Sequence, residues 1–155
     1  MSKPKLGELA QLAEIIAAIA VIVSLLYVAR GLNENTAAIR ATSAQEITTG
    51  TREALLAVAL DEQLSRIVQI GSSDVSKLTS EEAYRFSLFS RQRWLFLQGI
   101  WIQKELGVLD SRVWTAYERV ICSVLDDETG DRVEWKYHDD ILDPGFVDYV
   151  EKCSK

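Results

Sequence analysis

Residues 15–29 read IIAAIAVIVSLLYVA and contain no charged side chain. Extension of this run to residues 9–32 takes in Glu14 near one end and Arg30 near the other. A bilayer core of about 30 Å requires about 20 residues of helix. We therefore predict that residues 9–32 form a transmembrane helix. Glu14 is then close to one interface, Arg30 snorkels at the other, and Tyr27 lies at the depth of an interfacial aromatic.

Two other interpretations of this segment stay open. A cleaved signal peptide would use Lys3 and Lys5 as its basic region, but its exit site at residues 27–29 would place Tyr27 where a small residue is needed. The uncharged run is also short enough for a buried helix of a soluble domain. The membrane anchor is favoured because the extended segment has the length of a span.

Small side chains recur along one face of the predicted helix. They are Ala10, Ala13, Ala17, Ala20, Ser24 and Gly31, with Tyr27 as the one large residue in the row. A neighbouring row consists of the bulky aliphatics Leu9, Leu12, Ile16, Ile19, Val23 and Leu26. Helices in lipid associate through close backbone approach along small residues. We predict that this first row, the small stripe, packs against another helix while the bulky row faces lipid; alternatively, alanine is simply common in bacterial spans.

The charges around the span give weaker signals. Glu14 lies beside the small stripe, and an acid within a span is a functional candidate by default. Its place near the helix end favours the simpler interpretation of an ionised interfacial side chain. Lys3 and Lys5 precede the span, and Arg30 and Arg40 follow it. The basic-residue rule therefore favours a cytoplasmic N-terminus only slightly.

The whole chain is predicted to be all-α. Residues 1–8 are expected to form an N-terminal tail, and residues 33–60 a stalk helix that continues outward from the span, with a break at residues 48–50. Residues 61–155 are expected to form a soluble helical bundle with an acidic C-terminal region. The organisation is thus one anchor, one stalk and one bundle.

Local signals mark several helix ends in the bundle. Asp61 is expected to cap a short helix that ends at Gly71, and Thr79 with Glu82 forms a capping box at the start of the longest helix. Residues 94–102 of that helix are apolar nearly all round, which is typical of a central helix.

Further along the chain, Gly107 is expected to end the long helix and Asp110 to cap the next. Asp143 followed by Pro144 predicts the start of a last short helix. Residues 127–140 are charged and irregular, and a loop or helical turn is favoured there over an edge strand.

Composition argues against several function classes. The net charge of −6 arises in the last 35 residues, which hold four basic and ten acidic side chains. Such a region repels phosphates, so no nucleic-acid partner is expected, and we interpret it as a solvated face. With two cysteines and one histidine, neither a structural zinc site nor a disulfide framework is expected. Cys122 is interpreted as a small buried hydrophobe.

The motifs of nucleophilic catalysis, phosphate binding and metalloprotease chemistry are absent from the sequence. His138 beside Asp139 and Asp140 is a candidate general base or weak divalent site. It lies in a hydrophilic stretch, so a solvated loop histidine is the favoured interpretation. Arg85 and Arg93 are candidates for a partly buried polar site, which is more often structural than catalytic. We expect no enzyme activity and no cofactor.

The order of several short motifs resembles a broad set of uncharacterised bacterial membrane proteins. These motifs are LAEIIAAIAVIVSLLYVA, NENTAAIRA, LTSEEAYRF, KELGVLDSRVW and the isolated Trp135 followed by DPGFVDYV. The resemblance covers nearly the whole chain. It implies a single N-terminal anchor, a small helical domain and a bacterial inner membrane, and it transfers no functional residue.

Three functions are compatible with these features. The favoured one is a membrane-anchored module that self-assembles or serves as an accessory subunit, with the bilayer, a second copy or another membrane protein as its partner. The others are a ligand-sensing domain and an enzyme with an unfamiliar site. A pocket lined by Arg85, Arg93, Trp94 and Trp101 would favour these two, whereas complete burial of the four residues would favour assembly.

Overall fold

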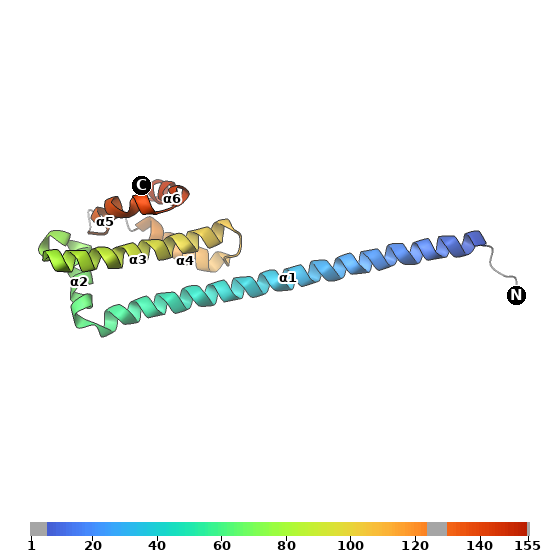
Figure 1. Ribbon diagram of the computed structural model, residues 1–155, viewed down its shortest axis with the longest axis horizontal. Helices are drawn as coiled ribbons and strands as arrows, with labels where there is room; N and C mark the ends of the chain where they lie inside the picture. Colours follow the sequence, from blue (N-terminus) through green and yellow to red (C-terminus); the bar gives the residue numbers. More distant parts are fainter. Residues whose placement is uncertain (1–5, 124–129, 155) are drawn as a thin grey trace. The chain divides into compact units, whose positions relative to one another are not determined.

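The computed structural model describes residues 6–123 and 130–154, which are mostly helical with no strand among them. The all-α prediction is therefore confirmed for this part of the chain. Six α-helices follow one another (Figure 1): α1 (Leu6–Leu60), α2 (Glu62–Ser73), α3 (Ser80–Glu105), α4 (Ser111–Ser123), α5 (Gly130–His138) and α6 (Pro144–Cys153). Two short 3-10 helices, Val75–Lys77 and Asp139–Ile141, lie between them.

The chain divides into two compact units, residues 1–39 and residues 40–155. The first unit, as far as it is described, is a single length of helix and has no core of its own. Its helix is the N-terminal part of α1, the one helix among the described residues that is long and apolar enough to cross a membrane. Residues 1–5 of the predicted tail lie outside the described residues, and α1 already begins at Leu6.

The second unit takes in residues 40–60, which belong to the predicted stalk, because side chains from this segment enter its core. Ile47 is 3% exposed, and the Thr51 hydroxyl forms a hydrogen bond with the Tyr117 hydroxyl on α4. Arg40 donates to the Gly107 carbonyl at 3.2 Å. This end of α1 is thus a packed element of the helical unit.

The predicted break at residues 48–50 is wrong, because α1 runs through it. The Thr48 hydroxyl donates to the Ala44 carbonyl four residues earlier at 2.8 Å, which satisfies it inside the helix. Gly50 is a contact residue here: a Cβ at this position would lie 3.0 Å from the ring of Phe96. The glycine therefore allows close packing rather than marking a helix end.

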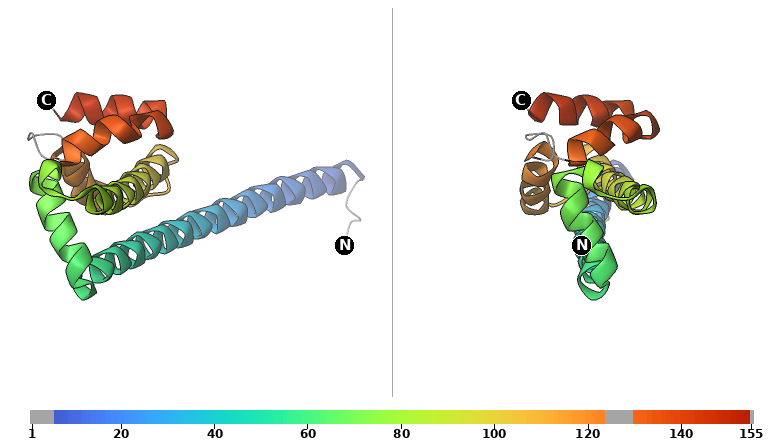
Figure 2. Two further views of the ribbon diagram at one scale, coloured as in Figure 1. Left: turned by 60° about the vertical axis from the view of Figure 1, so that its left-hand side comes forward. Right: turned by 90° about the vertical axis from the view of Figure 1, so that its left-hand side faces the viewer.

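The core of the second unit forms around α3. Its buried members are Ile47, Trp94, Leu97, Ile100, Leu109, Ile121, Trp135, Leu142, Phe146 and Val150. α3 contacts α2, α4 and α5, and α6 contacts α4. Figures 1 and 2 show α5 and α6 together on one side of α3. α3 is central as expected, but not on every face: Leu95 and Ile102 of the predicted all-round apolar run are 43% and 37% exposed.

The predicted caps are confirmed where they rest on local hydrogen bonds. Asp61 caps α2 by accepting from the Leu64 amide, and the Thr79–Glu82 capping box opens α3. Asp143 caps α6, with Pro144 in its first turn. Beyond α3, Gly107 has a φ of +70°, the left-handed conformation that favours glycine.

Two predictions about element ends are wrong for non-local reasons. α2 continues past Gly71 to Ser73, because Gly71 is buried against the ring of Phe86 rather than placed at a terminus. Residues 130–138, expected as loop or helical turn, form α5, whose Trp135 packs 4.4 Å from Trp94 between ring centroids. That aromatic contact stabilises a short polar helix with little intrinsic preference to form.

Candidate functional site

The small stripe lies wholly on the surface of α1. Ala10, Ala13, Ala17, Ala20, Ser24 and Gly31 are all exposed, and so is Glu14. The Ser24 hydroxyl donates to the Ala20 carbonyl at 2.8 Å, so this polar group is satisfied within the helix. A Cβ at Gly31 would meet nothing within 4 Å. The stripe therefore offers another helix a surface of small side chains that Tyr27 alone interrupts, between Ser24 and Gly31.

The bulky row on the neighbouring face is exposed to a similar degree. Leu9, Leu12, Ile16, Ile19, Val23 and Leu26 are each between 51% and 66% exposed. At the C-terminal end of this segment, Arg30 forms an ion pair with Glu34 one turn later, at 2.9 Å. Between Glu14 and Arg30 the helix thus carries no charged side chain and has the hydroxyls of Ser24 and Tyr27 as its polar side-chain groups, and the Arg30–Glu34 ion pair lies where the predicted span ends.

Arg93 lies in a polar seam between α3 and α5. Its guanidinium is 2.6 Å from the Asp131 carboxylate, and the two side chains are 26% and 16% exposed. Arg93 is therefore partly buried against a carboxylate of a neighbouring helix. Asp131 and the 4% exposed Glu134 belong to the acidic C-terminal region, so that region is not solvated throughout.

His138 lies at the other end of this polar seam between α3 and α5. The prediction of a solvated loop histidine is wrong. It is 8% exposed at the end of α5. Its Nε2 lies 3.2 Å from the Glu134 carboxylate and 3.2 Å from both the hydroxyl and the carbonyl of Ser87 on α3. The helical spacing of Glu134 and His138, four residues apart, brings the two side chains together.

Ser87, His138 and Glu134 are the residue types of a nucleophilic triad, but their arrangement is not one. In a triad the serine hydroxyl bonds to one ring nitrogen of the histidine and the acid accepts from the other, so that the ring can take the serine proton while the acid orients it. Here both the serine and the acid face Nε2. The cluster therefore joins α3 to α5 and lacks the geometry to activate the Ser87 hydroxyl.

Arg85 lies apart from this seam, in an open groove of about 550 Å³ between α1, α2 and α3. The groove is lined by Gly50, Glu53, Ala54, Ala57, Val58, Leu64, Arg85, Leu88, Phe89, Gln92 and Phe96. Its lining is mostly apolar, with Glu53 and Arg85 as ionisable groups of opposite charge. Arg85 and Arg93 thus belong to different surroundings and form no joint polar site.

Of the tryptophans expected near these arginines, Trp94 belongs to the core and Trp101 packs against it. Trp94 is fully buried, and its ring lies 6.5 Å from that of Phe146. Trp101 is half-buried, with its ring 5.8 Å from Phe146. Of the four residues proposed to distinguish a pocket from a core, Arg85 alone lines the groove. Three or more His, Cys, Asp or Glu side chains that could hold a metal ion do not gather anywhere in the described part of the chain.

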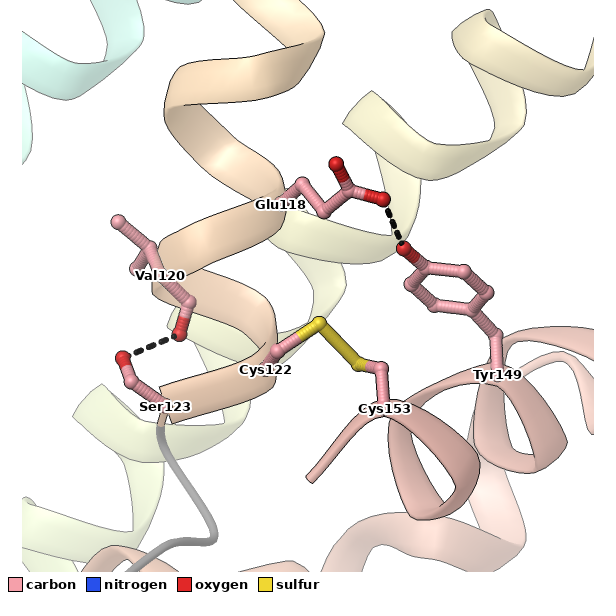
Figure 3. The surroundings of a disulfide bond; sticks show 6 residues. All are labelled: Glu118, Val120, Cys122, Ser123, Tyr149 and Cys153. Carbon is pink, nitrogen blue, oxygen red and sulfur yellow. Dashed lines mark hydrogen bonds between the residues drawn. A yellow bond between two sulfur atoms is a disulfide. The ribbon is translucent and has the colours of Figure 1, made fainter. Parts of the chain in front are cut away.

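A seam between α4 and α6 contains a feature that the sequence did not reveal. Cys122 and Cys153 form a disulfide, with Cα atoms 5.2 Å apart (Figure 3). Cys122 is therefore not the free, buried hydrophobe that was expected. One turn earlier on each helix, the Tyr149 hydroxyl donates to the Glu118 carboxylate at 2.7 Å. Burial, together with this acceptor, raises the pKa of Tyr149 well above its usual value, so the phenol remains a donor.

The chain matches no protein-family profile, no curated protein and no solved structure, so no relative assigns a role to any of these residues.

Proposed function

We propose that this protein is a single-pass membrane protein whose helical domain acts by assembly, as a self-associating or accessory subunit of a membrane complex, and not as an enzyme. The observation that carries the proposal is the exposed apolar surface of α1 over residues 9–32. A water-soluble monomer rarely leaves a continuous apolar surface larger than a few hundred Å² uncovered. Lipid and a partner helix are the surroundings that suit it.

The character of this segment supports a span over a soluble core helix. A core helix is mostly buried, whereas none of the apolar window of the described helix that starts at Leu9 is buried. The hydroxyl of Ser24 is satisfied inside the helix, which removes an exposed donor from the hydrocarbon. The bulky and small rows then give the span a lipid-facing and a helix-facing side.

Association through the small stripe is tested by matched substitutions in the full chain. Ala17→Leu adds bulk on the stripe, while Ala18→Leu makes the same change one residue later, on another face of α1. In mild detergent, Ala17→Leu should weaken association by roughly tenfold, about 1.4 kcal/mol, because the backbones can no longer approach closely. Ala18→Leu should leave it unchanged.

The masses of the detergent-solubilised proteins, measured by light scattering over a concentration series, provide the readout. A wild-type chain that is strictly monomeric and co-purifies with no other membrane protein would contradict the proposal. Equal losses from the two substitutions would contradict the role of the stripe alone.

A ligand-sensing domain is the second candidate, and the groove beside Arg85 is the observation that favours it. A mostly apolar groove suits an amphiphile, and Arg85 is its one cationic group for an acidic head, with Glu53 as the group of opposite charge. A series of medium-chain fatty acids should then raise the melting temperature of the full chain, and Arg85→Ala should abolish the shift. Absence of any shift across the series would remove this candidate.

A further inference from the structure

The two cysteines of the chain pair with each other, which leaves no free thiol. Disulfides form and persist outside the cytoplasm, where no glutathione or thioredoxin pool keeps thiols reduced. We infer that the domain formed by residues 40–155 lies on the extracytoplasmic side of the membrane and that the N-terminus lies in the cytoplasm. In this compartment the Cys122–Cys153 disulfide forms and joins α4 to α6. This inference rests on the proposed anchor for its orientation, and on the cysteine pair for its compartment.

The pairing is built into the packing of α4 on α6. Each cysteine follows, by one helical turn, a residue that already connects the two helices: Glu118 precedes Cys122, and Tyr149 precedes Cys153. The ring of Tyr149 also packs against Trp114, with centroids 5.8 Å apart. These contacts lie one turn before the two cysteines on each helix, and they place Cys122 and Cys153 opposite each other between α4 and α6 (Figure 3).

Formation of the bond requires a partner of a definite chemical class. The thiolate of one cysteine attacks an exchange-active disulfide and forms a mixed disulfide; the second thiolate then attacks this bond and releases the partner as a dithiol. The chain loses two protons and two electrons, and the partner disulfide is reduced by the same two electrons. Extracytoplasmic thiol–disulfide oxidants supply this class of reagent.

The disulfide indicates which way the predicted span crosses the membrane, whereas the basic residues on its two sides are nearly equal in number. Lys3 and Lys5 precede the predicted span, and Arg30 and Arg40 follow it. A domain outside the cytoplasm places the two lysines inside, which agrees with the slight preference of the basic-residue rule. Any partner of the helical domain is then extracytoplasmic or shares the membrane.

The test uses intact cells that express the full chain. Free thiols are blocked with a permeant maleimide, the protein is reduced, and newly exposed thiols are labelled with a maleimide coupled to a polymer of visible gel mobility. We expect no labelling without reduction and two labels after it. A Cys122→Ser chain should lack the reduction-dependent labels, since its remaining cysteine is blocked at the start. Two free thiols in the wild-type chain from intact cells would overturn the inference.

Orientation is read with a membrane-impermeant maleimide on a chain that keeps both native cysteines. Ser65→Cys adds an exposed thiol on α2, and Ser2→Cys adds one before the predicted span. The Ser65→Cys chain should be labelled in intact spheroplasts, and the Ser2→Cys chain only after permeabilisation. The reverse pattern overturns the orientation. Release of the protein by alkaline carbonate would instead overturn the anchor, while the reduction assay still reports on the disulfide.

Discussion

At Gly71 the backbone of α2 approaches the ring of Phe86, which is fully buried. A Cβ at Gly71 would lie 2.5 Å from a carbon of this buried ring, so one of the two would have to shift. Gly71→Ala should therefore lower the free energy of unfolding by about 1–3 kcal/mol through overpacking. Denaturant titration of the detergent-solubilised chain, followed by tryptophan fluorescence, measures the change.

Gly99 provides the matched control for this substitution. It also lies within a helix, but a Cβ there would meet nothing within 4 Å. Gly99→Ala should raise stability by up to about 1 kcal/mol, because alanine has the higher helix propensity. Equal destabilisation by both substitutions would show that the ring of Phe86 is not the cause.

Asp110 gives a residue-scale prediction for pH. Hydrogen bonds from the Arg112 side chain and from its backbone amide lower the pKa of Asp110 from 3.8 to about 2. Because the folded pKa is depressed, this stabilisation is present above pH 3.8 and is lost as the pH falls toward 2. Asp110→Asn should flatten the pH dependence of the unfolding free energy between about pH 4 and 2. An unchanged slope in this window would contradict the assignment.

At the scale of helices, the ion pair of Arg93 with Asp131 is predicted to hold α5 against α3. Arg93→Ala leaves a largely buried carboxylate without its partner, so it should reduce stability by about 2 kcal/mol. Arg91→Ala changes an exposed arginine on the same helix and should stay within about 0.5 kcal/mol. Thermal unfolding of the two variants compares them, and similar losses would argue against a specific role for the seam.

The disulfide between α4 and α6 closes a loop of 31 residues. Reduction should lower the free energy of unfolding by about 3–4 kcal/mol, since the reduced unfolded chain gains conformational freedom. Urea unfolding with and without a phosphine reductant measures the difference. The Cys122→Ser, Cys153→Ser double variant should not respond to reductant. Identical curves for the oxidised and reduced wild type would contradict the stabilising role.

Whether the sequence predicted a helical element depended on where its stabilising contacts lie. The capping box at Thr79 and Glu82 was readable because its two hydrogen bonds lie within four consecutive residues. The role of Gly71 and the helical form of α5 could not be predicted from the sequence, because each depends on an aromatic ring of α3, Phe86 for Gly71 and Trp94 for α5. The same holds for His138, whose partner Ser87 lies 51 residues away.

The disulfide could not be predicted from the sequence for a related reason. Cys122 and Cys153 are separated by 31 residues, and that spacing by itself indicates no pairing. The aligned contact of Glu118 with Tyr149 becomes visible only once α4 and α6 are packed together. Among the candidate site residues, the separation of Arg93 from Arg85 likewise required the fold.

At the scale of the whole molecule, the two units differ in whether their apolar side chains are buried or exposed. The unit of residues 40–155 encloses a core of aromatic and aliphatic side chains, while residues 9–32 of α1 expose theirs. Such a division suits a protein that folds in water on one side of a bilayer and uses the bilayer to cover the remaining helix. Membrane insertion of that helix is the central claim.

Alkaline carbonate extraction of membranes that contain the full chain, followed by intact mass measurement, tests this claim most directly. Carbonate strips peripheral proteins but leaves spanning helices in the bilayer. We predict that the chain remains in the membrane pellet and keeps residues 1–32 in its measured mass. Recovery of the intact chain in the carbonate supernatant would contradict the anchor and favour a soluble helix. Recovery of a chain shortened within residues 1–32 would contradict it in favour of a cleaved signal peptide.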